Sequence, residues 1–440
     1  MDWQSLDETQ RDAISACLDK SKRFVAVSGA AGTGKTTIMQ LVYNELINVG
    51  YNPVLCAPTG KAARRITEAT GFQASTIHKL LEFPHPHEVD EATGKALNPT
   101  RPKRHRQNPL DFTAVLVDEA AMVNHELFAD LSDAMPMGSK LCLFGDINQL
   151  PPIEAEGNYL NRVSPFHSAM YDNTPTGLKV KGNLLTTIHR QGEGSGIVKN
   201  GINILSGRYP ARYDDFSVIS TKYHITKLKE LLDEKDGPDF TSIDNQIIVP
   251  GNKGWIGTRK LNAILQAYLN PSFKDKGLTV ARHKWDQRDG ENYWLAVGDK
   301  IIITSNMYDV GLAGVMNGET GKIIEITEYG ELIIDFGTEV IAIPPDIVST
   351  YNNKESHFNP QKSIDLAYCV TTHKTQGSEY KEIVYLIDPC HRYVLHRNNF
   401  YTAVTRARKK ATVIFDSRAM SNALAAKPLQ FKAKTNGKPS

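Results

Sequence analysis

Cysteine is scarce in this chain of 440 residues, and the five cysteines lie far apart. None of them forms a C-x-x-C pair, and an odd, scattered set argues against structural zinc and for a reducing compartment. Long hydrophobic runs are also missing, since no stretch reaches the roughly 18 apolar residues of a membrane helix. The opening residues, MDWQSLDETQ, lack the apolar segment of a signal peptide. We therefore expect a cytoplasmic protein that makes no use of a membrane.

An excess of charge is the third absence. The chain has 51 Lys and Arg against 49 Asp and Glu, a net charge of +2, so any basic surface must be local. The densest basic cluster is RPKRHR at 101–106, and its pattern leaves open whether it is a solvated loop or a binding patch. What is present is an ordinary globular composition, 40% hydrophobic, in a length that predicts roughly two to four domains.

The first third of the chain alternates strand and helix patterns. Continuous apolar runs, typical of buried parallel strands, lie at 24–27, 53–57, 114–118 and 140–146. Helical patterns lie between them at 36–48, 61–69 and 125–134. This alternation predicts a doubly wound α/β domain.

A second α/β pattern begins near residue 182. It includes an amphipathic helix ending near Gly207, a strand at 245–250 and a helix at 258–269. Short strands separated by glycine turns at 271–360 predict a small antiparallel barrel inserted into this second domain.

These patterns divide the chain into two interrupted domains. Residues 1–82 and 110–181 form the first α/β domain, which residues 83–109 interrupt. Residues 182–270 and 361–440 form the second, which the β module at 271–360 interrupts. Within the first insertion, EATGKAL at 91–97 is a candidate hairpin.

The first strand leads into GAAGTGKT, which fits the P-loop pattern G-x-x-x-x-G-K-[ST] between a strand and a helix. Glycines let backbone N–H groups surround a phosphate, and the helix N-terminus adds partial positive charge. We expect Lys35 to reach the β- and γ-phosphates of ATP and Thr36 to hold Mg²⁺. The residues predicted to bind ATP here are Gly29, Ala30, Ala31, Gly32, Thr33, Gly34, Lys35, Thr36 and Thr37.

Polar residues at the ends of later elements suit hydrolysis. Asp118 and Glu119 end the apolar run AVLVD, at the strand end where α/β sheets bind ligands. Asp118 is the expected Mg²⁺ ligand, and Glu119 the expected general base or water-positioning group. Gln149 follows another strand and could sense the γ-phosphate, although alone it could equally be an ordinary polar loop residue. Arg190 and Arg406 could act as arginine fingers, although an isolated arginine more often forms a surface ion pair. The chain is therefore predicted to bind and hydrolyse a nucleoside triphosphate.

Eight motifs follow one another along the chain: GAAGTGKT, LCAPTGKAARR, STIHKLL, LVDEAAM, GDINQLPPI, TTIHRQ, VTTHKTQGSEY and YTAVTRARKK. This ordered set resembles the superfamily-1 helicases, and more narrowly their group-B, RecD-like members, which include the Dda-type phage helicases. The resemblance spans residues 10–408. It implies two RecA-like P-loop domains in tandem, a small hairpin inserted in the first and an SH3-like β-barrel inserted in the second.

The resemblance also implies an activity, ATP-driven translocation from 5′ to 3′ along single-stranded DNA with unwinding of duplex. ATP and Mg²⁺ would be the cofactors, and single-stranded DNA and ss/dsDNA junctions the substrates. Single-strand-binding or replisome proteins are candidate partners, and a monomer can work because both halves of the ATP site lie in one chain. If the protein is viral, its compartment is the host cytoplasm.

Individual residues receive roles from the same resemblance. It implies that Gln10 reads adenine, that Glu379 contacts the nucleotide, and that Arg190 and Arg406 are the arginine fingers. The residues it places on single-stranded DNA are Pro58, Thr59, Thr76, His78, Thr372 and His373. It identifies no strand-separating pin, for which Phe83 is a candidate only because it is aromatic.

Two alternatives stay open. One is a P-loop ATPase of another class. Nucleotide kinases lack VTTHKTQGSEY and YTAVTRARKK, whereas an RNA helicase would be separated only by comparing DNA- with RNA-stimulated ATP turnover. The other is a non-catalytic scaffold that kept the fold, which intact Lys35, Glu119, Arg190 and Arg406 disfavour. The motifs do not choose between replication, recombination and repair.

Overall fold

The computed structural model describes residues 6–84, 101–152, 164–174, 177–187, 194–235, 237–280, 293–307, 310–311, 314–351 and 354–426. The chain divides into two compact units, residues 1–195 with 428–440 and residues 196–427. The division between them falls after residue 195, whereas the sequence analysis placed the domain boundary after residue 181. The hairpin predicted at 91–97 lies outside the described residues.

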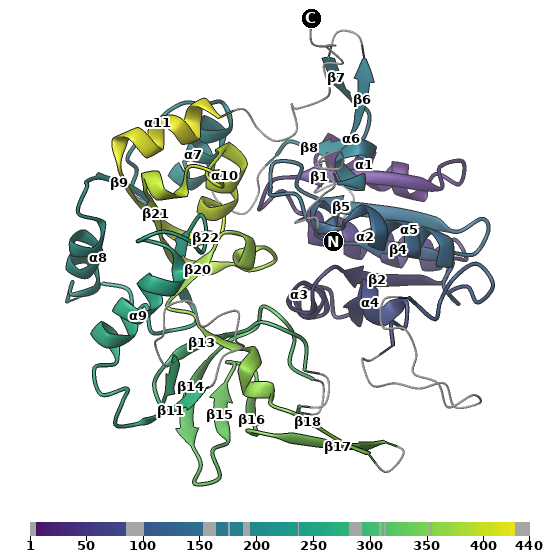
Figure 1. Ribbon diagram of the computed structural model, residues 1–440. Helices are drawn as coiled ribbons and strands as arrows, with labels where there is room; N and C mark the ends of the chain where they lie inside the picture. The colour runs from purple at the N-terminus through teal and green to yellow at the C-terminus, as the bar shows by residue number, and fades with distance from the viewer. Residues whose placement is uncertain are drawn as a thin grey trace, which may run out of the picture. The chain divides into compact units, whose positions relative to one another are not determined.

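The first unit contains a six-stranded parallel sheet in the order β3-β2-β4-β5-β1-β8 (Figure 1). Its strands are β1 (Phe24–Gly29), β2 (Pro53–Ala57), β3 (Ala74–Thr76), β4 (Ala114–Val117), β5 (Lys140–Gly145) and β8 (Asn183–Leu185). The four strands predicted from apolar runs are confirmed. β8 pairs with β1, so residues 183–185 lie in the first sheet although the sequence analysis assigned them to the second domain.

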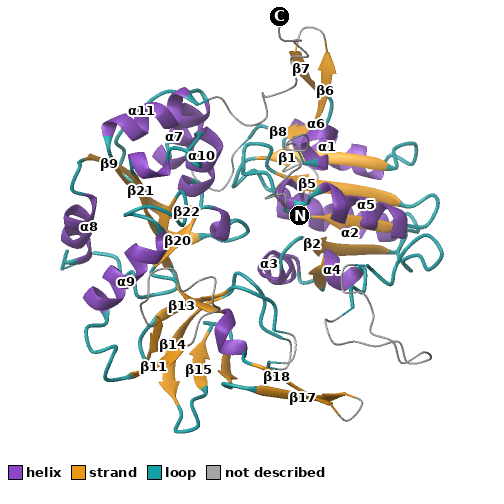
Figure 2. Cartoon of the chain, in the orientation of Figure 1, coloured by secondary structure: helices purple, strands orange, loops and turns teal. Residues whose placement is uncertain are grey.

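Helices cover both faces of this sheet (Figure 2). Along β1, Val25 and Val27 pack in one hydrophobic cluster with α1, α2 and α3, whereas Ala26 packs in another with α4, α5 and α6. The helices are α1 (Glu8–Leu18), α2 (Lys35–Asn48), α3 (Gly60–Thr70), α4 (Ile77–Leu80), α5 (His125–Ala134) and α6 (Pro165–Met170). The three helices predicted between the strands agree with α2, α3 and α5 to within one residue at each end.

The second unit contains a parallel sheet in the order β20-β10-β21-β22-β9. Its strands are β9 (Phe216–Ser220), β10 (Asn245–Val249), β20 (Cys369–Thr371), β21 (Tyr380–Ile387) and β22 (Ala407–Phe415). Its helices are α7 (Gly196–Leu205), α8 (His224–Leu232), α9 (Thr258–Leu269), α10 (Arg397–Val404) and α11 (Ser417–Ala425). The predicted helix at 258–269 matches α9, while β9 and α8 were not predicted.

An antiparallel sheet in the order β16-β15-β14-β13-β19 belongs to the same unit. Its strands are β13 (Lys300–Ile303), β14 (Thr320–Ile326), β15 (Leu332–Asp335), β16 (Val340–Ile343) and β19 (Ile364–Leu366). The antiparallel pairing is as predicted, but β19 lies beyond the predicted end of the module at residue 360. Closure into an SH3-like barrel stays a prediction.

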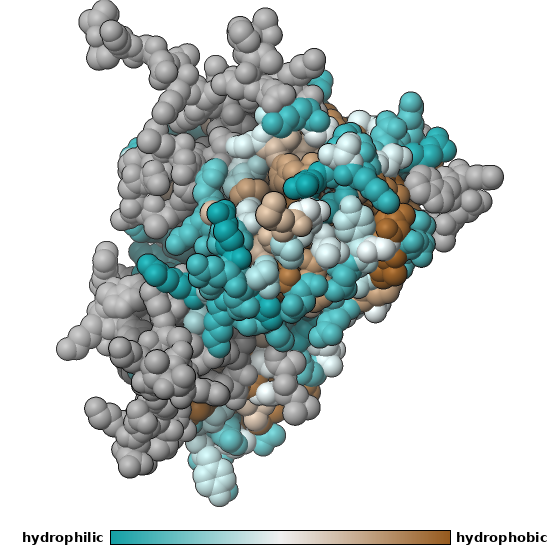
Figure 3. All heavy atoms as spheres, turned by 90° about the vertical axis from the view of Figure 1, so that its right-hand side faces the viewer, coloured by the Kyte–Doolittle hydropathy of each residue, from teal (hydrophilic) through white to brown (hydrophobic). Residues whose placement is uncertain are grey.

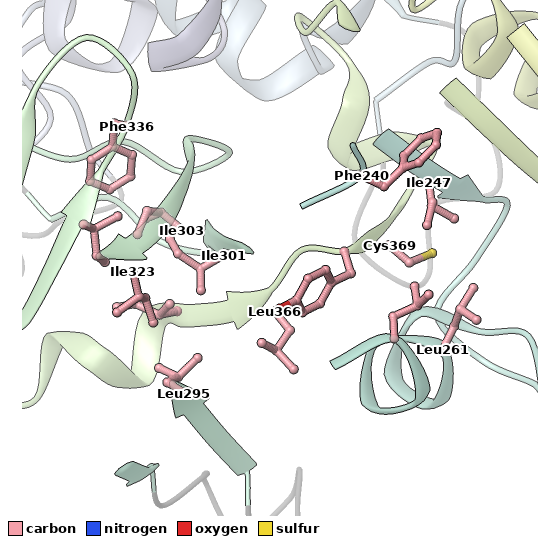
Figure 4. Close-up of a cluster of buried hydrophobic side chains, with 14 of the residues drawn as sticks. Phe240, Ile247, Leu261, Leu295, Ile301, Ile303, Ile323, Phe336, Leu366 and Cys369 are labelled. Atoms are coloured by element: carbon pink, nitrogen blue, oxygen red, sulfur yellow. The ribbon is translucent and has the colours of Figure 1, made fainter. Parts of the chain in front are cut away.

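The antiparallel and parallel sheets share one hydrophobic core, with members on α9, β10, β13 and β19 (Figure 4). Only residues 367–368 separate β19 from β20. Asn262 of α9 holds this junction, because its Nδ2 donates to the carbonyl oxygens of Leu366 at 3.0 Å and Cys369 at 2.9 Å. Its Oδ1 accepts from the Cys369 N–H at 2.7 Å. The two sheets are therefore joined by packing and by buried hydrogen bonds.

Ion pairs occupy part of the basic cluster at 101–106. Arg104 lies 2.8 Å from Glu82 and 3.3 Å from Asp111, and Arg106 lies 3.4 Å from Asp133. Such exposed pairs contribute about 0–1 kcal/mol each, but they partly neutralise the cluster. These two arginines therefore favour the solvated-loop interpretation over a binding patch.

Among the residues coloured in Figure 3, hydrophilic and hydrophobic areas alternate over the surface. Across the ranges given above, no helix combines the length and the apolarity needed to span a bilayer.

We predict that Asn262→Leu lowers the free energy of unfolding of the second unit by about 3 kcal/mol, because it removes three buried hydrogen bonds to the backbone of residues 366 and 369. Chemical denaturation measures this loss. The matched control is Asn422→Leu on α11, where the asparagine is exposed and we expect little change. Equal effects of the two substitutions would contradict the role of Asn262 in the junction.

Candidate functional site

The turn between β1 and α2 requires glycine. Gly32 and Gly34 have φ angles of 85° and 81°, a conformation that costs other residues about 1–2 kcal/mol. A Cβ at Gly34 would lie 2.8 Å from Nε2 of Gln10, and a Cβ at Gly29 would collide with Oγ1 of Thr33. The glycines of the motif are therefore explained by the shape of the turn.

Lys35, the first residue of α2, turns its ammonium group back onto this loop. Nζ donates to the carbonyl oxygens of Gly29 at 2.7 Å and Ala30 at 3.0 Å. Oγ1 of Thr33 donates to the same Ala30 carbonyl at 2.9 Å. A cation beside a glycine-rich turn at a helix N-terminus is an arrangement suited to binding phosphate.

Gln10 on α1 reaches the same loop. Its Nε2 donates to the carbonyl oxygen of Thr33 at 3.1 Å, and its Oε1 accepts from the N–H of Asp7 at 3.2 Å in a capping box. The side chain is buried, so both ends of its amide have partners within the protein. The structure thus brings Gln10 to the P-loop, and adenine reading stays a prediction.

Asp118 and Glu119 follow β4. The Asp118 N–H donates to the carbonyl oxygen of Cys56 at 3.0 Å, and Asp118 Oδ1 accepts from the Glu119 N–H at 2.8 Å. Glu119 has a φ of 50°, a strained conformation that costs about 1–3 kcal/mol outside glycine. Its buried Oε2 has no hydrogen-bond partner among the described residues. Strain and an unpartnered carboxylate oxygen together mark a functional position.

The charges around this pair shift its protonation. Burial and the neighbouring Glu119 raise the pKa of Asp118 to about 6, while the positive charges of Lys35 and Arg65 oppose the shift. A divalent cation would favour the ionised form in the same way. Together with the unpartnered oxygen of Glu119, this makes the acidic pair suitable for Mg²⁺.

Gln149 lies in the loop after β5, and its buried Oε1 has no hydrogen-bond partner among the described residues. Ile147 fixes the loop, because its N–H donates to Oγ of Ser28 at 3.1 Å and its carbonyl oxygen lies 2.9 Å from Nε2 of His167. Since a carbonyl only accepts, that Nε2 carries the proton, and Nδ1 accepts from Oγ of Ser164 at 2.7 Å. Burial lowers the pKa of His167 to about 4, so the ring is neutral near pH 7.

The strand order arranges these groups in a row. The strands are parallel, so their carboxyl ends lie at one edge of the sheet, about 4.8 Å apart from strand to strand. β5 is the neighbour of β1, and β4 follows β5. The P-loop, Gln149 and Asp118 therefore start within about 10 Å of one another, while β3 ends about 19 Å from β1.

The DNA-contact candidates of the first unit occupy the far end of this row. Thr59 follows β2 and caps α3, accepting from the Ala62 N–H, and Thr76 ends β3 and caps α4, accepting from the Lys79 N–H. Neither hydroxyl donates to another described residue, so both O–H groups can donate to a ligand. Pro58 is partly exposed and His78 is exposed.

Phe83 does not project from the protein. Its ring is partly buried against the hydrophobic cluster that includes α4 and α5, and its centroid lies 5.0 Å from that of His78. A ring packed in this way suits the core. The suggestion that Phe83 is a strand-separating pin is therefore not supported.

Arg406 lies between α10 and β22 and is buried, with 2% of its surface exposed. Nε donates to the carbonyl oxygen of Thr402 at 3.0 Å and Nη1 to that of Ser378 at 3.3 Å. Glu379 follows Ser378 directly, so the structure brings Arg406 and the Glu379 segment together at the amino ends of β21 and β22. Among the described residues, Nη2 has no hydrogen-bond acceptor. Arg190 lies outside the described residues.

Thr372 and His373 lie at the opposite edge of the second sheet, after β20. The Thr372 N–H donates to the carbonyl oxygen of Val249 at the end of β10, at 3.0 Å, and its hydroxyl bonds Oδ1 of Asn399 at 2.9 Å. Its side chain is fully buried, so a DNA contact through the hydroxyl stays only a prediction. His373 is partly exposed, and burial lowers its pKa.

Sequence reasoning missed three residues that act on this site. Ser28 and His167 hold the loop of Gln149, and Arg65 on α3 acts on the charge of Asp118. Ser28 is the one polar side chain in the otherwise apolar run before Gly29. That pattern could have indicated a hydrogen-bonding role for Ser28. Nothing in the sequence around His167 indicated its role.

Two family profiles and several known proteins are similar to this chain. An AAA domain profile matches residues 5–221, and a UvrD-like helicase C-terminal domain profile matches residues 366–414. The chain is 30% identical over 391 residues to the ATP-dependent RecD2 DNA helicase of Deinococcus radiodurans, covering 88% of this chain and 46% of that protein. It is 26% identical over 479 residues to the RecBCD enzyme subunit RecD of Haemophilus influenzae, covering 96% and 70%. The chain thus spans about half the length of the RecD2 relative.

Solved Pif1 helicases share the fold. Bacteroides Pif1 bound to ssDNA has a TM-score of 0.55 at 19% identity, covering 96% of this chain and 93% of that one. Candida albicans Pif1 has a TM-score of 0.53 at 16% identity, covering 96% and 98%. The chain therefore has an α/β fold with two parallel sheets, like the tandem RecA-like domains of Pif1- and RecD-type helicases, and its first sheet carries the P-loop and the acidic pair. These matches support a RecD-like, group-B superfamily-1 helicase.

We predict that Asp118→Asn abolishes ATP hydrolysis and stabilises the protein near pH 7.5. The folded-state pKa of Asp118 is raised above 3.8, so the folded protein binds the proton more tightly and loses stability as pH rises from about 4 to about 6. Asparagine cannot ionise, so the variant does not lose this stability as pH rises. Thermal unfolding of both proteins should show a higher Tm for the variant near pH 7.5 and a smaller difference near pH 4. A variant less stable than wild type near pH 7.5 would refute the assigned shift.

Proposed function

We propose that this protein is an ATP-dependent DNA helicase that translocates on single-stranded DNA and unwinds duplex. The observation that carries the proposal is the single edge of the first sheet. That edge holds the P-loop, Gln149 and the acidic pair toward one end, and Thr59 and Thr76 toward the other. A nucleotide and single-stranded DNA bound there would both contact loops at the ends of the neighbouring strands β4 and β2.

For hydrolysis, the P-loop N–H groups and Lys35 bind the phosphates of ATP, and Glu119 orients the attacking water and accepts its proton at the unpartnered Oε2. Thr36 and Asp118 would hold Mg²⁺, which neutralises phosphate charge when bound. Gln149 reports the state of the γ-phosphate through a loop that Ser28 and His167 keep in place.

Coupling between the two ends of the edge has a short physical route. β2 leads to Thr59, and α3 begins directly after that residue. α3 carries Arg65, whose positive charge opposes the rise in the pKa of Asp118. The N–H of Asp118 donates to the carbonyl oxygen of Cys56 on β2. Movement of Thr59 on DNA therefore acts on the elements that position Asp118. This is a pathway inferred from contacts, and it predicts DNA-stimulated ATP turnover.

We propose that Arg190, which precedes the division between the units, and Arg406 of the second unit act on the γ-phosphate as arginine fingers, with Glu379 beside the nucleotide. Nη2 of Arg406 is the part of its guanidinium available for this contact. Alternating strong and weak grip by the two units would then move the protein along the strand. The 5′ to 3′ direction is consistent with the RecD-like group.

The proposed substrates are single-stranded DNA and ss/dsDNA junctions, with His373 and the threonines of the first unit among the contacts. Pif1 structures with ssDNA and with forked dsDNA support this choice. We further propose that a monomer is sufficient and that single-strand-binding or replisome proteins are partners.

A strand-displacement assay tests the function. Duplexes with a 5′ or a 3′ single-stranded tail, in DNA and in RNA, are compared with and without ATP. We expect ATP-dependent displacement of the 5′-tailed DNA substrate. ATP turnover stimulated by RNA but not by DNA would replace the proposal with an RNA helicase, and absence of any displacement would reject it.

We predict that Lys35→Ala reduces ATP turnover at least about 10³-fold, because the phosphates lose their cation, while single-stranded DNA still binds. Phosphate release and oligonucleotide binding measure the two effects. Lys20→Ala, at an exposed lysine of the same unit, is the control and should behave like wild type. Normal turnover in Lys35→Ala would disprove the phosphate-binding assignment.

A further inference from the structure

Three loops gather at the carboxyl edge of the second sheet, after β9, β10 and β21. They are residues 221–223, 250–257 and 388–396. The rings of His224, which follows the first loop, and Trp255 lie 6.0 Å apart, and Nε2 of His224 bonds the carbonyl oxygen of Ile387 at 2.9 Å. A Cβ at Gly254 would lie 2.7 Å from Sγ of Cys390. The three loops therefore pack against one another.

Each of these loops exposes one large aromatic side chain. Tyr223 is 77% exposed, Trp255 45% and Tyr393 83%. We call these three residues the aromatic edge. Large exposed rings gathered on neighbouring loops mark a candidate interaction site.

Charge at the aromatic edge is positive. Lys222, Lys253 and Arg392 are exposed beside the three rings, and the guanidinium of Arg392 lies 4.6 Å from the centroid of the Tyr393 ring. The three loops contain one carboxylate, Asp388, which is buried and accepts from the Cys390 N–H. Exposed rings alternating with cations, without exposed carboxylates, suit a polyanion with flat bases better than they suit an apolar protein segment.

The aromatic edge continues the DNA-contact segment of the same unit. β10 and β20 are neighbours, and the Thr372 N–H bonds the carbonyl oxygen of Val249, the last residue of β10. The loop with Trp255 therefore starts beside the segment that carries His373. The spacing between neighbouring β-strands is about 4.8 Å. Single-stranded DNA that contacts His373, after β20, would therefore need to extend only by that distance to reach the loop of Trp255, after β10.

We propose that Tyr223, Trp255 and Tyr393 form a platform on which bases of single-stranded DNA stack, with Lys222, Lys253 and Arg392 along the phosphates. The inference rests on the proposed function and specifies how the second unit holds its strand. Because every base has a π-face, the platform tolerates any sequence.

The test compares two ligands of equal length, an oligo-dT strand and an abasic strand that keeps the phosphates but lacks bases. Their binding to the full chain is measured by fluorescence anisotropy. One stacked base contributes about 1–3 kcal/mol, so Trp255→Ala should weaken oligo-dT binding roughly 5- to 150-fold. Its affinity for the abasic strand should equal that of wild type. Tyr393→Ala should also weaken oligo-dT binding. Because Tyr393 is highly exposed, we expect its replacement to leave the stability of the fold unchanged.

Two controls make the outcome specific. Trp255→Phe keeps an aromatic face and should retain most of the affinity for oligo-dT. Tyr329→Ala removes a ring that is 76% exposed in the turn between β14 and β15, outside the aromatic edge, and should change neither ligand.

Unchanged oligo-dT binding in both Trp255→Ala and Tyr393→Ala overturns the platform, as does an equal loss for both ligands. If wild type still binds oligo-dT and hydrolyses ATP faster with it, the proposed function survives that result. A wild-type protein that binds no oligonucleotide overturns both.

Discussion

The parallel pairing of β2 with β4 is the interaction on which the organisation of the first unit depends. In its register Cys56 lies opposite Val117, and the next residue, Asp118, donates its N–H to the Cys56 carbonyl. A slip of one residue would turn the Asp118 side chain to the other face of the sheet. The pairing thus fixes the position of Asp118, the proposed Mg²⁺ ligand, relative to the end of β2, where the proposed DNA contact Thr59 follows.

In the second unit, the groups proposed to act on nucleotide and on DNA lie at opposite ends of the sheet. Arg406 and the Glu379 segment lie at the amino ends of β21 and β22, whereas His373 lies at the carboxyl edge. β21 has eight residues, so these groups are about 23 Å apart along the strand. In the first unit, the groups predicted to bind nucleotide and DNA follow neighbouring strands along one edge, while in the second unit they lie at opposite ends of the sheet.

The parts of this structure that were predictable from sequence depend on local chemistry. The P-loop requires glycines at defined positions, and helices such as α5 begin at a capping residue, here Asn124, so motif and boundary can be read directly. β8, β9 and β19 were missed because their identity as strands depends on the neighbours with which they pair. The role of His167 depends on a contact with Ile147, distant in sequence, which no local pattern encodes.

Buried charge is a second limit of sequence reasoning. Lys140 is buried, with Nζ donating to the carbonyl oxygens of Asp19 at 2.8 Å and Lys22 at 2.6 Å. Its position at the start of an apolar run gave no sign of these partners, because they lie more than a hundred residues away in the chain. The candidate site was predictable to the extent that its groups follow strand ends, whereas the supporting bonds beneath it were not.

The short, hydrogen-bonded junction between β19 and β20 has a mechanical consequence. The shared core and the two-residue connection oppose pivoting of the antiparallel sheet against the parallel one. Any rotation of the second unit during turnover is therefore transmitted to the tip of the β14–β15 hairpin as to the end of a lever. Because the tip lies at the end of the hairpin, a small rotation would displace it further than the core. A dye attached there would report such rotations on a single molecule.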